Sequence, residues 1–210
     1  MDLHIYFWPV AARYLSDKGW FGFLTSSSWL DARYGFPLQR WALLNFRIHA
    51  VIESVDEPWF EDARVKTVVV LMQRCDEKQL RDKNIVRFVR LLRPLAEILG
   101  KREDEASRQQ AAEHFRDVLL KIKTDFHNGQ FRVLCKSQSD LWSDGQSVAR
   151  MFAKQKELSS ASAQPAEDQD DEDAPVEASD ESLITTDYGG GKWGRYLRAL
   201  VTSLRSNMGC

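Results

Sequence analysis

Three apolar runs in the first third of the chain constrain its fold more than any other feature: Trp20–Leu24, Ile48–Ile52 and Val65–Met72. The gap between the first two runs is long, and Tyr34–Phe46 within it has helical character, which suffices for a crossover between parallel strands. The gap between the second and third runs is short and contains Pro58. Because a helical crossover does not fit there, we expect a hairpin with an antiparallel third strand. The sequence therefore predicts an α/β fold whose parallel sheet ends in an antiparallel hairpin.

The same residues, taken as an ordered set, resemble the later motifs of the adenine-specific (N6) DNA methyltransferases of restriction–modification and phage-defence systems. GWFGFLTSSSWL is similar to their fifth strand and the polar loop after it, and RIHAVIESVDEPWF to their sixth strand and a loop with an aromatic residue. VKTVVVLMQR is similar to their last, antiparallel strand, and DLHIYFWPVAARYLSDKG to the helix after their catalytic motif. The resemblance implies the C-terminal part of a class I (Rossmann-like) S-adenosylmethionine-dependent methyltransferase sheet.

Two motifs of that family are missing from the sequence. It contains neither an Asn-Pro-Pro-Tyr nor an Asp-Pro-Pro-Tyr motif, and no Gly-rich turn follows a strand to seat the cofactor. In the family both precede the segments matched here, so we expect a fragment that is inactive alone. The intact enzyme would transfer a methyl group from S-adenosylmethionine to the adenine amino group of double-stranded DNA. The alternatives are a subunit that docks onto a separately encoded N-terminal half and a product of a decayed gene.

The sequence divides into four predicted regions. Residues 1–76 correspond to the half-domain described above. Residues 77–156 form an α+β accessory region, which resembles an element inserted before target recognition in that family. Its predicted strands and helices, in chain order, are a strand over Asn84–Leu92, a helix over Asp104–Lys123, a strand over Gln130–Cys135 and a shorter helix over Gly145–Leu158.

Charge separates the other two regions. Residues 157–186 hold ten Asp and Glu and no Lys or Arg, although the formal net charge of the chain is only −2. Its central part, Ser159–Ser182, has almost no large apolar residue, so the segment predicts a disordered acidic linker. The alternative is a DNA mimic. The remaining chain is net basic, which suits a polyanionic partner, although a solvated surface has the same composition. Residues 187–210 contain YGGGKWGRYLRA, which resembles the opening of the target-recognition domain.

Phe60 is the principal site candidate in the sequence. It follows Pro58 and Trp59 in the loop between the second and third predicted strands. The resemblance places it where the family stacks an extruded adenine, and an extruded base needs an aromatic face. The alternative is that Phe60 or Trp59 covers the hydrophobic core.

Two further groups are candidates near the N-terminus. Asp2 and Phe7 match the residues that line the cofactor's adenine pocket in the family; the alternative is a buried stripe of a core helix, formed by Leu3, Phe7, Val10, Ala11 and Tyr14. Ser26 and Ser27 follow the carboxyl end of a strand, the edge where open α/β sheets bind ligands. They are candidates for DNA contact, and a helix N-cap is the alternative.

The last candidates interleave basic and aromatic side chains: Lys192, Trp193, Arg195 and Arg198. Such a segment can bind phosphates while its rings stack. The alternative is a domain-entry loop whose aromatic residues dock on the catalytic domain.

Compartment and metal content follow from what the sequence lacks. Cys75, Cys135 and Cys210 lie far apart without metal-ligand spacing, and the four histidines show no pairing typical of a metal site or a triad. No signal peptide and no apolar run long enough to cross a bilayer is present. We therefore expect a cytoplasmic protein with no metal site and no membrane partner.

Overall fold

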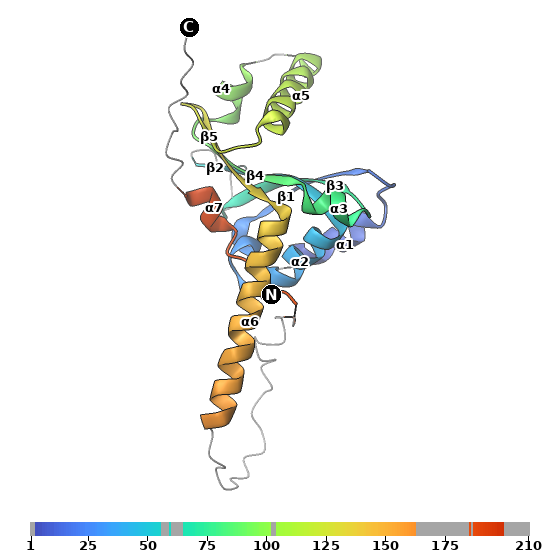
Figure 1. The fold of residues 1–210 in the computed structure, drawn as a ribbon. Helices are drawn as coiled ribbons and strands as arrows, with labels where there is room; N and C mark the ends of the chain where they lie inside the picture. The colour runs from blue at the N-terminus through green and yellow to red at the C-terminus, as the bar shows by residue number, and fades with distance from the viewer. Residues whose placement is uncertain are drawn as a thin grey trace.

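The computed structural model describes residues 3–55, 59, 65–101, 104–162, 185 and 187–199. Its centre is a six-stranded mixed sheet in the order β1-β3-β2-β4-β6-β5 (Figure 1). The strands are β1 Trp20–Ser26, β2 Phe46–Ser54, β3 Thr67–Arg74, β4 Ile85–Leu91, β5 Phe126–His127 and β6 Phe131–Ser137. The helices are α1 His4–Ala12, η1 Ser27–Leu30, η2 Arg33–Gly35, α2 Phe36–Asn45, α3 Lys78–Asp82, α4 Leu95–Leu99, α5 Glu105–Lys121, α6 Gln138–Ser162 and α7 Gly194–Arg198.

The first three strands have the directions that the apolar runs predict. Strands β1 and β2 are joined by η1, η2 and α2, and both pair with β3 in the antiparallel sense. They therefore run in the same direction, with β3 between them. The prediction that the sheet ends in this hairpin is wrong, because the other edge of β2 pairs with β4 and the hairpin lies inside a mixed sheet. The other edge of β1 pairs with no described strand, so β1 ends the sheet.

The strands predicted within residues 77–156 are also confirmed, and they extend this same sheet. Strand β4 pairs with β2 in parallel, and β6 pairs with β4 in the antiparallel sense. Residues 1–76 and 77–156, which are predicted as two regions, therefore contribute strands to one sheet.

The helix expected over Gly145–Leu158 is longer at both ends, and α6 runs from Gln138 to Ser162. Glycine disfavours helix interiors, yet Gly145 lies inside α6. In the structure, a Cβ on Gly145 would lie 2.1 Å from the Tyr188 ring, and close packing explains the glycine. The first residues of the expected linker, 157–162, are therefore helical; of the remaining linker residues only Thr185 lies within the described part.

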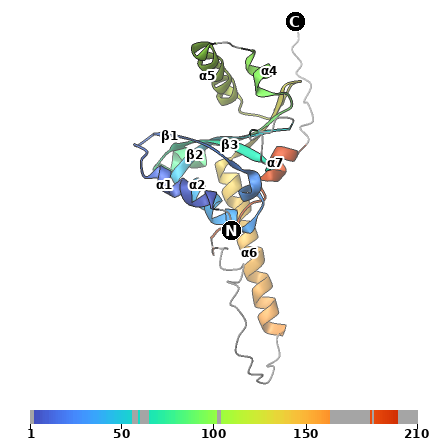
Figure 2. The same cartoon turned by 180° about the vertical axis from the view of Figure 1, so that it is seen from behind.

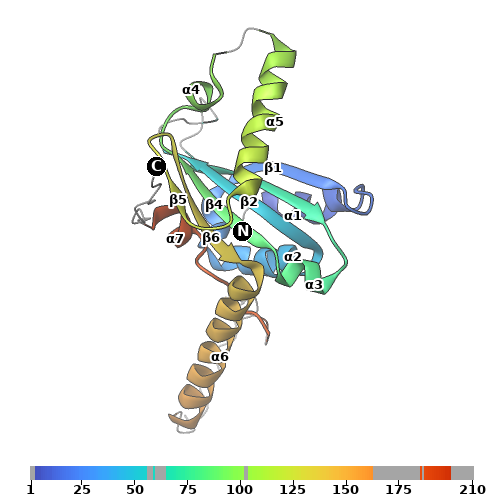
Figure 3. The same cartoon turned by 45° about the horizontal axis from the view of Figure 1, so that its top comes forward.

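Helices cover both faces of the sheet. The larger core lies on the face with α1, α2, α7 and the start of α6, and contains Trp8, Trp29, Phe46, Phe88 and Trp193. A smaller core lies on the opposite face beneath α5 (Figures 2 and 3). The second half of α6 extends away from the sheet (Figure 1). In the described part of the chain, no helix combines the length and apolar character of a membrane span.

Helix α5 confirms the amphipathic helix expected over Asp104–Lys123. Asp104 caps its start, accepting a hydrogen bond from the Ser107 backbone N–H at 2.8 Å. At the other end, the buried Arg87 guanidinium donates to the carbonyl oxygens of Leu120 and Ile122, each at 2.7 Å. Arg87 lies on β4, so these bonds fix the end of α5 to the sheet.

Helix α1 contradicts the buried stripe that was the alternative for its residues. Trp8 and Ala12 are buried, whereas Leu3, Phe7, Val10 and Tyr14 are exposed. The reason is the Trp8 ring, which packs 5.2 Å from Trp29 and 5.6 Å from Phe21 and Phe23. That packing turns the Trp8 face toward the sheet and leaves an apolar stripe in solvent.

Candidate nucleic-acid interface

The C-terminal segment, residues 187–199, packs on the sheet face that carries the larger core, next to α2 and α6 (Figure 1). Asp187 anchors its beginning by accepting two hydrogen bonds from Arg40 of α2, at 2.9 and 2.7 Å. The hydrogen bonds from Arg40, and then the one from Thr185, lower the pKa of the Asp187 carboxyl to about 2. The segment is thereby fixed at its entry by a bidentate ion pair.

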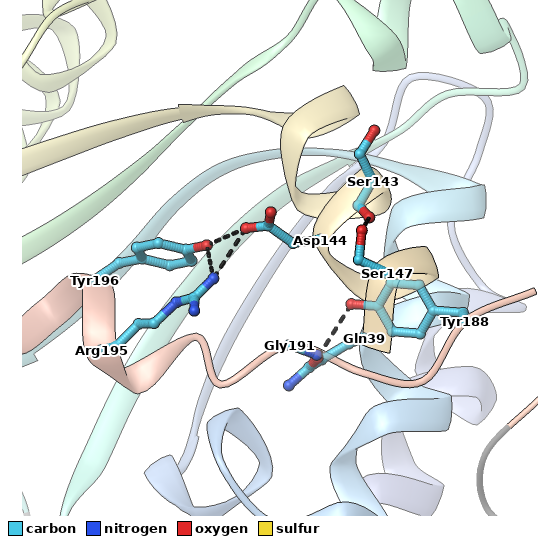
Figure 4. Close-up of polar contacts among 8 residues, drawn as sticks. All are labelled: Gln39, Ser143, Asp144, Ser147, Tyr188, Gly191, Arg195 and Tyr196. Atoms are coloured by element: carbon cyan, nitrogen blue, oxygen red, sulfur yellow. Dashed lines mark hydrogen bonds and ion pairs between the residues drawn. The ribbon is translucent and has the colours of Figure 1, made fainter. Parts of the chain in front are cut away.

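Gln39 of α2 connects this segment to η1, and Figure 4 shows it beside Tyr188 and Gly191 of the segment. Its side chain is fully buried, with 0% exposed. The amide nitrogen donates to the carbonyl oxygens of Trp29 and Leu30, both at 3.1 Å. The amide oxygen accepts from the Tyr188 hydroxyl at 3.1 Å and from the Gly191 N–H at 2.9 Å. One amide thus satisfies backbone groups from two segments far apart in sequence.

Gly190 lets the backbone pass close to α2. Its φ is +83°, and a Cβ there would lie 2.0 Å from the Phe36 ring. A side chain would be strained in conformation and would also clash with that ring. The glycine run therefore brings the segment against the start of α2.

Tyr196, Arg195 and Asp144 form a polar cluster between α7 and α6 (Figure 4). The Tyr196 hydroxyl donates to the Asp144 carboxylate at 2.6 Å and accepts from Arg195 at 2.7 Å. Arg195 also bonds Asp144 at 2.9 Å. Burial raises the pKa of Tyr196, so this hydroxyl stays protonated and keeps donating to Asp144.

A cleft of about 980 Å³ opens between the C-terminal segment, α6 and the loop before α2. Its basic side chains are Arg33, Lys192, Arg195 and Arg198, and its acidic ones are Asp31 and Asp144. Arg198 pairs with Asp31 at 2.7 Å. The side chains of this pair and of the Arg195–Asp144 pair are 37–56% exposed. Exposed pairs contribute little stability, and an arginine has donors to spare, so the arginines can also bind an incoming anion. The apolar lining includes Phe36, Val148, Met151 and Phe152.

The structure brings together three of the four candidates of the C-terminal segment. Lys192, Arg195 and Arg198 are exposed and line the cleft. Trp193 does not fit the predicted DNA contact: it is 1% exposed and packs edge-to-face on Trp29, with ring centroids 5.7 Å apart. Trp193 fits the alternative of an aromatic residue that docks in the protein core, because a fully buried ring has no face for a base.

The other candidates lie elsewhere or outside the described residues. Ser26 caps η1 by accepting from the Ser28 N–H at 3.3 Å, as the N-cap alternative expects, and neither Ser26 nor Ser27 lines the cleft. Phe7 is 61% exposed on α1, away from the cleft. Asp2 and Phe60 are outside the described residues, so their roles stay predictions.

Arg33 and Phe152 are cleft residues that could not be predicted from the sequence. The Arg33 guanidinium carbon lies 5.6 Å from the centre of the Phe152 ring, although the two residues belong to segments far apart in sequence. Arg33 begins η2, in the connection between β1 and α2, and only the general tendency of connecting segments to carry function points to it. Nothing in the helical pattern around Phe152 distinguishes it from an ordinary apolar position.

A second cleft, of about 670 Å³, lies between α4, α5 and the turn from β5 to β6. His114 is the one titratable side chain in its lining. This second cleft has no lysine or arginine in its lining and therefore does not suit a polyanion. In the described part of the chain, no three His, Cys, Asp or Glu side chains come together as metal ligands.

No protein-family model matches this chain, and no curated protein matches it either.

Proposed function

We propose that this chain forms part of an adenine-specific DNA methyltransferase. The observation that carries the proposal is the arrangement of β1, β2 and β3: two strands of one direction joined through α2, with an antiparallel strand between them. The directions of these three strands support the proposal, because the sequence resemblance implies the same directions. The catalytic Asn-Pro-Pro-aromatic motif and the Gly-rich turn are then supplied from outside these 210 residues.

S-adenosylmethionine, the cofactor implied by that family, does not find a formed site in the described residues. Phe7 is largely exposed and lines neither cleft. Asp2, the acidic residue expected beside it, lies outside the described residues, and none of the clefts described here includes Phe7. The residues do not fit the group, and no step of the reaction is assigned to this chain.

The cleft lined by Arg33, Lys192, Arg195 and Arg198, called the basic cleft below, contacts the DNA backbone in this proposal. Lys192, Arg195 and Arg198 present three cationic groups to this cleft, and lysine and arginine are the usual partners of phosphate oxygens. Such contacts give affinity without sequence information, and that affinity falls with salt. Lys192→Gln should accordingly weaken binding to all DNA sequences alike and lower the salt dependence.

The experiment that tests the proposal is to read the genomic DNA around the coding region. An Asn-Pro-Pro-aromatic motif and a Gly-rich turn, in frame upstream or in an adjacent gene, would support it. Neighbouring reading frames with neither motif would contradict it, because a methyltransferase needs both.

A second candidate function is a docking subunit that completes the sheet of a separately encoded methyltransferase half. The exposed stripe of α1 favours it, together with β1, whose outer edge pairs with no described strand and which carries neither charge nor proline. An unprotected apolar edge is a place for another strand to pair. Co-purification of the chain with an adjacent gene product would favour this candidate, and loss of that complex in a Val10→Glu variant would locate the contact.

A further inference from the structure

The basic cleft has an apolar, aromatic side that phosphate contacts alone do not explain. Phe152 and Met151 of α6 line it together with Lys192 and Arg195, and Met151 is 71% exposed. Core packing accounts for Phe36 in the same lining, since it is buried against the glycine run. It does not account for Met151, which the structure leaves in solvent.

Arg33 adds a flat cationic group over the same ring. Its guanidinium lies above Phe152 at 5.6 Å. A guanidinium plane and an aromatic ring are the two surfaces on which unpaired nucleic-acid bases stack. The cleft thus places a stacking surface beside cationic side chains.

The cleft also has a suitable size. Its volume, about 980 Å³, lies near the top of the range of about 300–1,000 Å³ typical of sites for small molecules. A ligand that combines a flat apolar ring with a negative charge matches both sides at once. A nucleotide has that combination, whereas an inorganic anion uses only the basic side.

We infer that the cleft binds an unpaired nucleotide of a DNA strand, with its phosphate at Lys192 and Arg195 and its base against Phe152 and Arg33. The inference rests on the proposed function for its partner, DNA, and adds that the cleft takes the base as well as the backbone. A paired base inside a duplex cannot reach Phe152, so single-stranded DNA binds more tightly than duplex.

The test uses the full chain and three fluorescent ligands: a single-stranded oligonucleotide, an abasic phosphodiester strand of equal length, and the duplex. The two strands have nearly the same charge, so the ratio of their Kd values reports the base contact. Stacking on an aromatic ring is worth a factor of roughly 5 to 150 in Kd, and the wild type should prefer the base-bearing strand by a factor in that range.

Variants assign the preference to the cleft. Phe152→Ala and Phe152→Leu should remove it while leaving affinity for the abasic strand unchanged, and the leucine variant keeps an apolar side chain in case alanine disturbs α6. Phe152→Tyr should retain the preference. The matched control is Leu158→Ala, an exposed apolar residue on the same helix outside the cleft. Lys192→Gln should weaken binding to both strands equally.

Equal affinity for the base-bearing and abasic strands would overturn the inference, as would a preference that survives in both Phe152→Ala and Phe152→Leu. If both strands bind equally and Lys192→Gln weakens both, the phosphate contact of the proposed function stands and only the base contact fails. If no ligand binds, both the base contact and the DNA contact fail. The genomic neighbourhood tests the methyltransferase assignment separately.

Discussion

Replacing Gln39 by methionine should loosen the C-terminal segment, because one buried amide joins it to η1. Methionine has nearly the same length and favours helices equally, so the change removes hydrogen bonds with little change in packing. Leu30 keeps a partner for its carbonyl oxygen, since the Trp193 N–H donates to it at 2.9 Å. The Trp29 carbonyl, the Tyr188 hydroxyl and the Gly191 N–H each lose the bond they make with Gln39.

The expected cost follows from these three groups. A buried polar group left without its partner costs about 1–3 kcal/mol, and neighbouring losses do not add fully. We therefore expect Gln39→Met to lower the free energy of unfolding by about 3–5 kcal/mol. Urea denaturation followed by tryptophan fluorescence is a suitable assay, since Trp29 and Trp193 are both buried beside Gln39.

The control is Gln109→Met on α5, where the glutamine is exposed and bonds only the neighbouring Glu113 among the described contacts. It should change stability by less than about 0.5 kcal/mol. Trypsin should cut the Gln39→Met variant faster after Lys192 and Arg195. A loss below about 1 kcal/mol with unchanged cleavage would refute the assignment of Gln39 as the residue that fixes the segment.

Three other predictions concern pH, activity and association. Burial lowers the pKa of His49 to about 4, from an unfolded value of about 6.5, so the unfolded state takes up the proton first as pH falls. The free energy of unfolding should therefore be constant above about pH 6.5 and drop by up to about 3 kcal/mol toward pH 4. Urea midpoints of His49→Gln should lack that part of the decline. The chain alone should transfer no labelled methyl group from S-adenosylmethionine to DNA, because it lacks the catalytic motif, and incorporation above a no-protein control would reveal an unrecognised active site. The chain should self-associate through the exposed stripe of α1, and Phe7→Glu should shift sedimentation toward the monomer; identical sedimentation of the variant and an associated wild type would place the contact elsewhere.

Five of the six described strands could be predicted from the sequence, because each needs only a local apolar run and a gap of suitable length. The exception is β5, whose two residues are too few to give a pattern. Their neighbours could not all be predicted. The insertion of β3 between β1 and β2 depends on pairing along both of its edges, and the parallel pairing of β4 with β2 joins segments from two predicted regions. Those pairings are tertiary contacts that leave no mark on any single strand.

The cleft shows the same limit at the level of side chains. Lys192, Arg195 and Arg198 could be predicted because they stand together in one short segment with an unusual composition. Arg33 and Phe152 could not, because an arginine before α2 and a phenylalanine on α6 are unremarkable until the fold brings them together. Gln39 was missed for a related reason: a polar residue inside a helix appears solvated unless its distant partners are known.

The C-terminal segment reconciles the two interpretations that its sequence left open. Along it, Trp193, Tyr196 and Leu197 are buried, while Lys192, Arg195 and Arg198 are exposed. This spacing of three and four residues is that of one helical turn, with an apolar face and a basic face. The buried face docks on the sheet, so the charged face is held in a fixed direction toward the cleft. Docking and anion binding are therefore properties of different side chains of the same short segment, and the first makes the second possible.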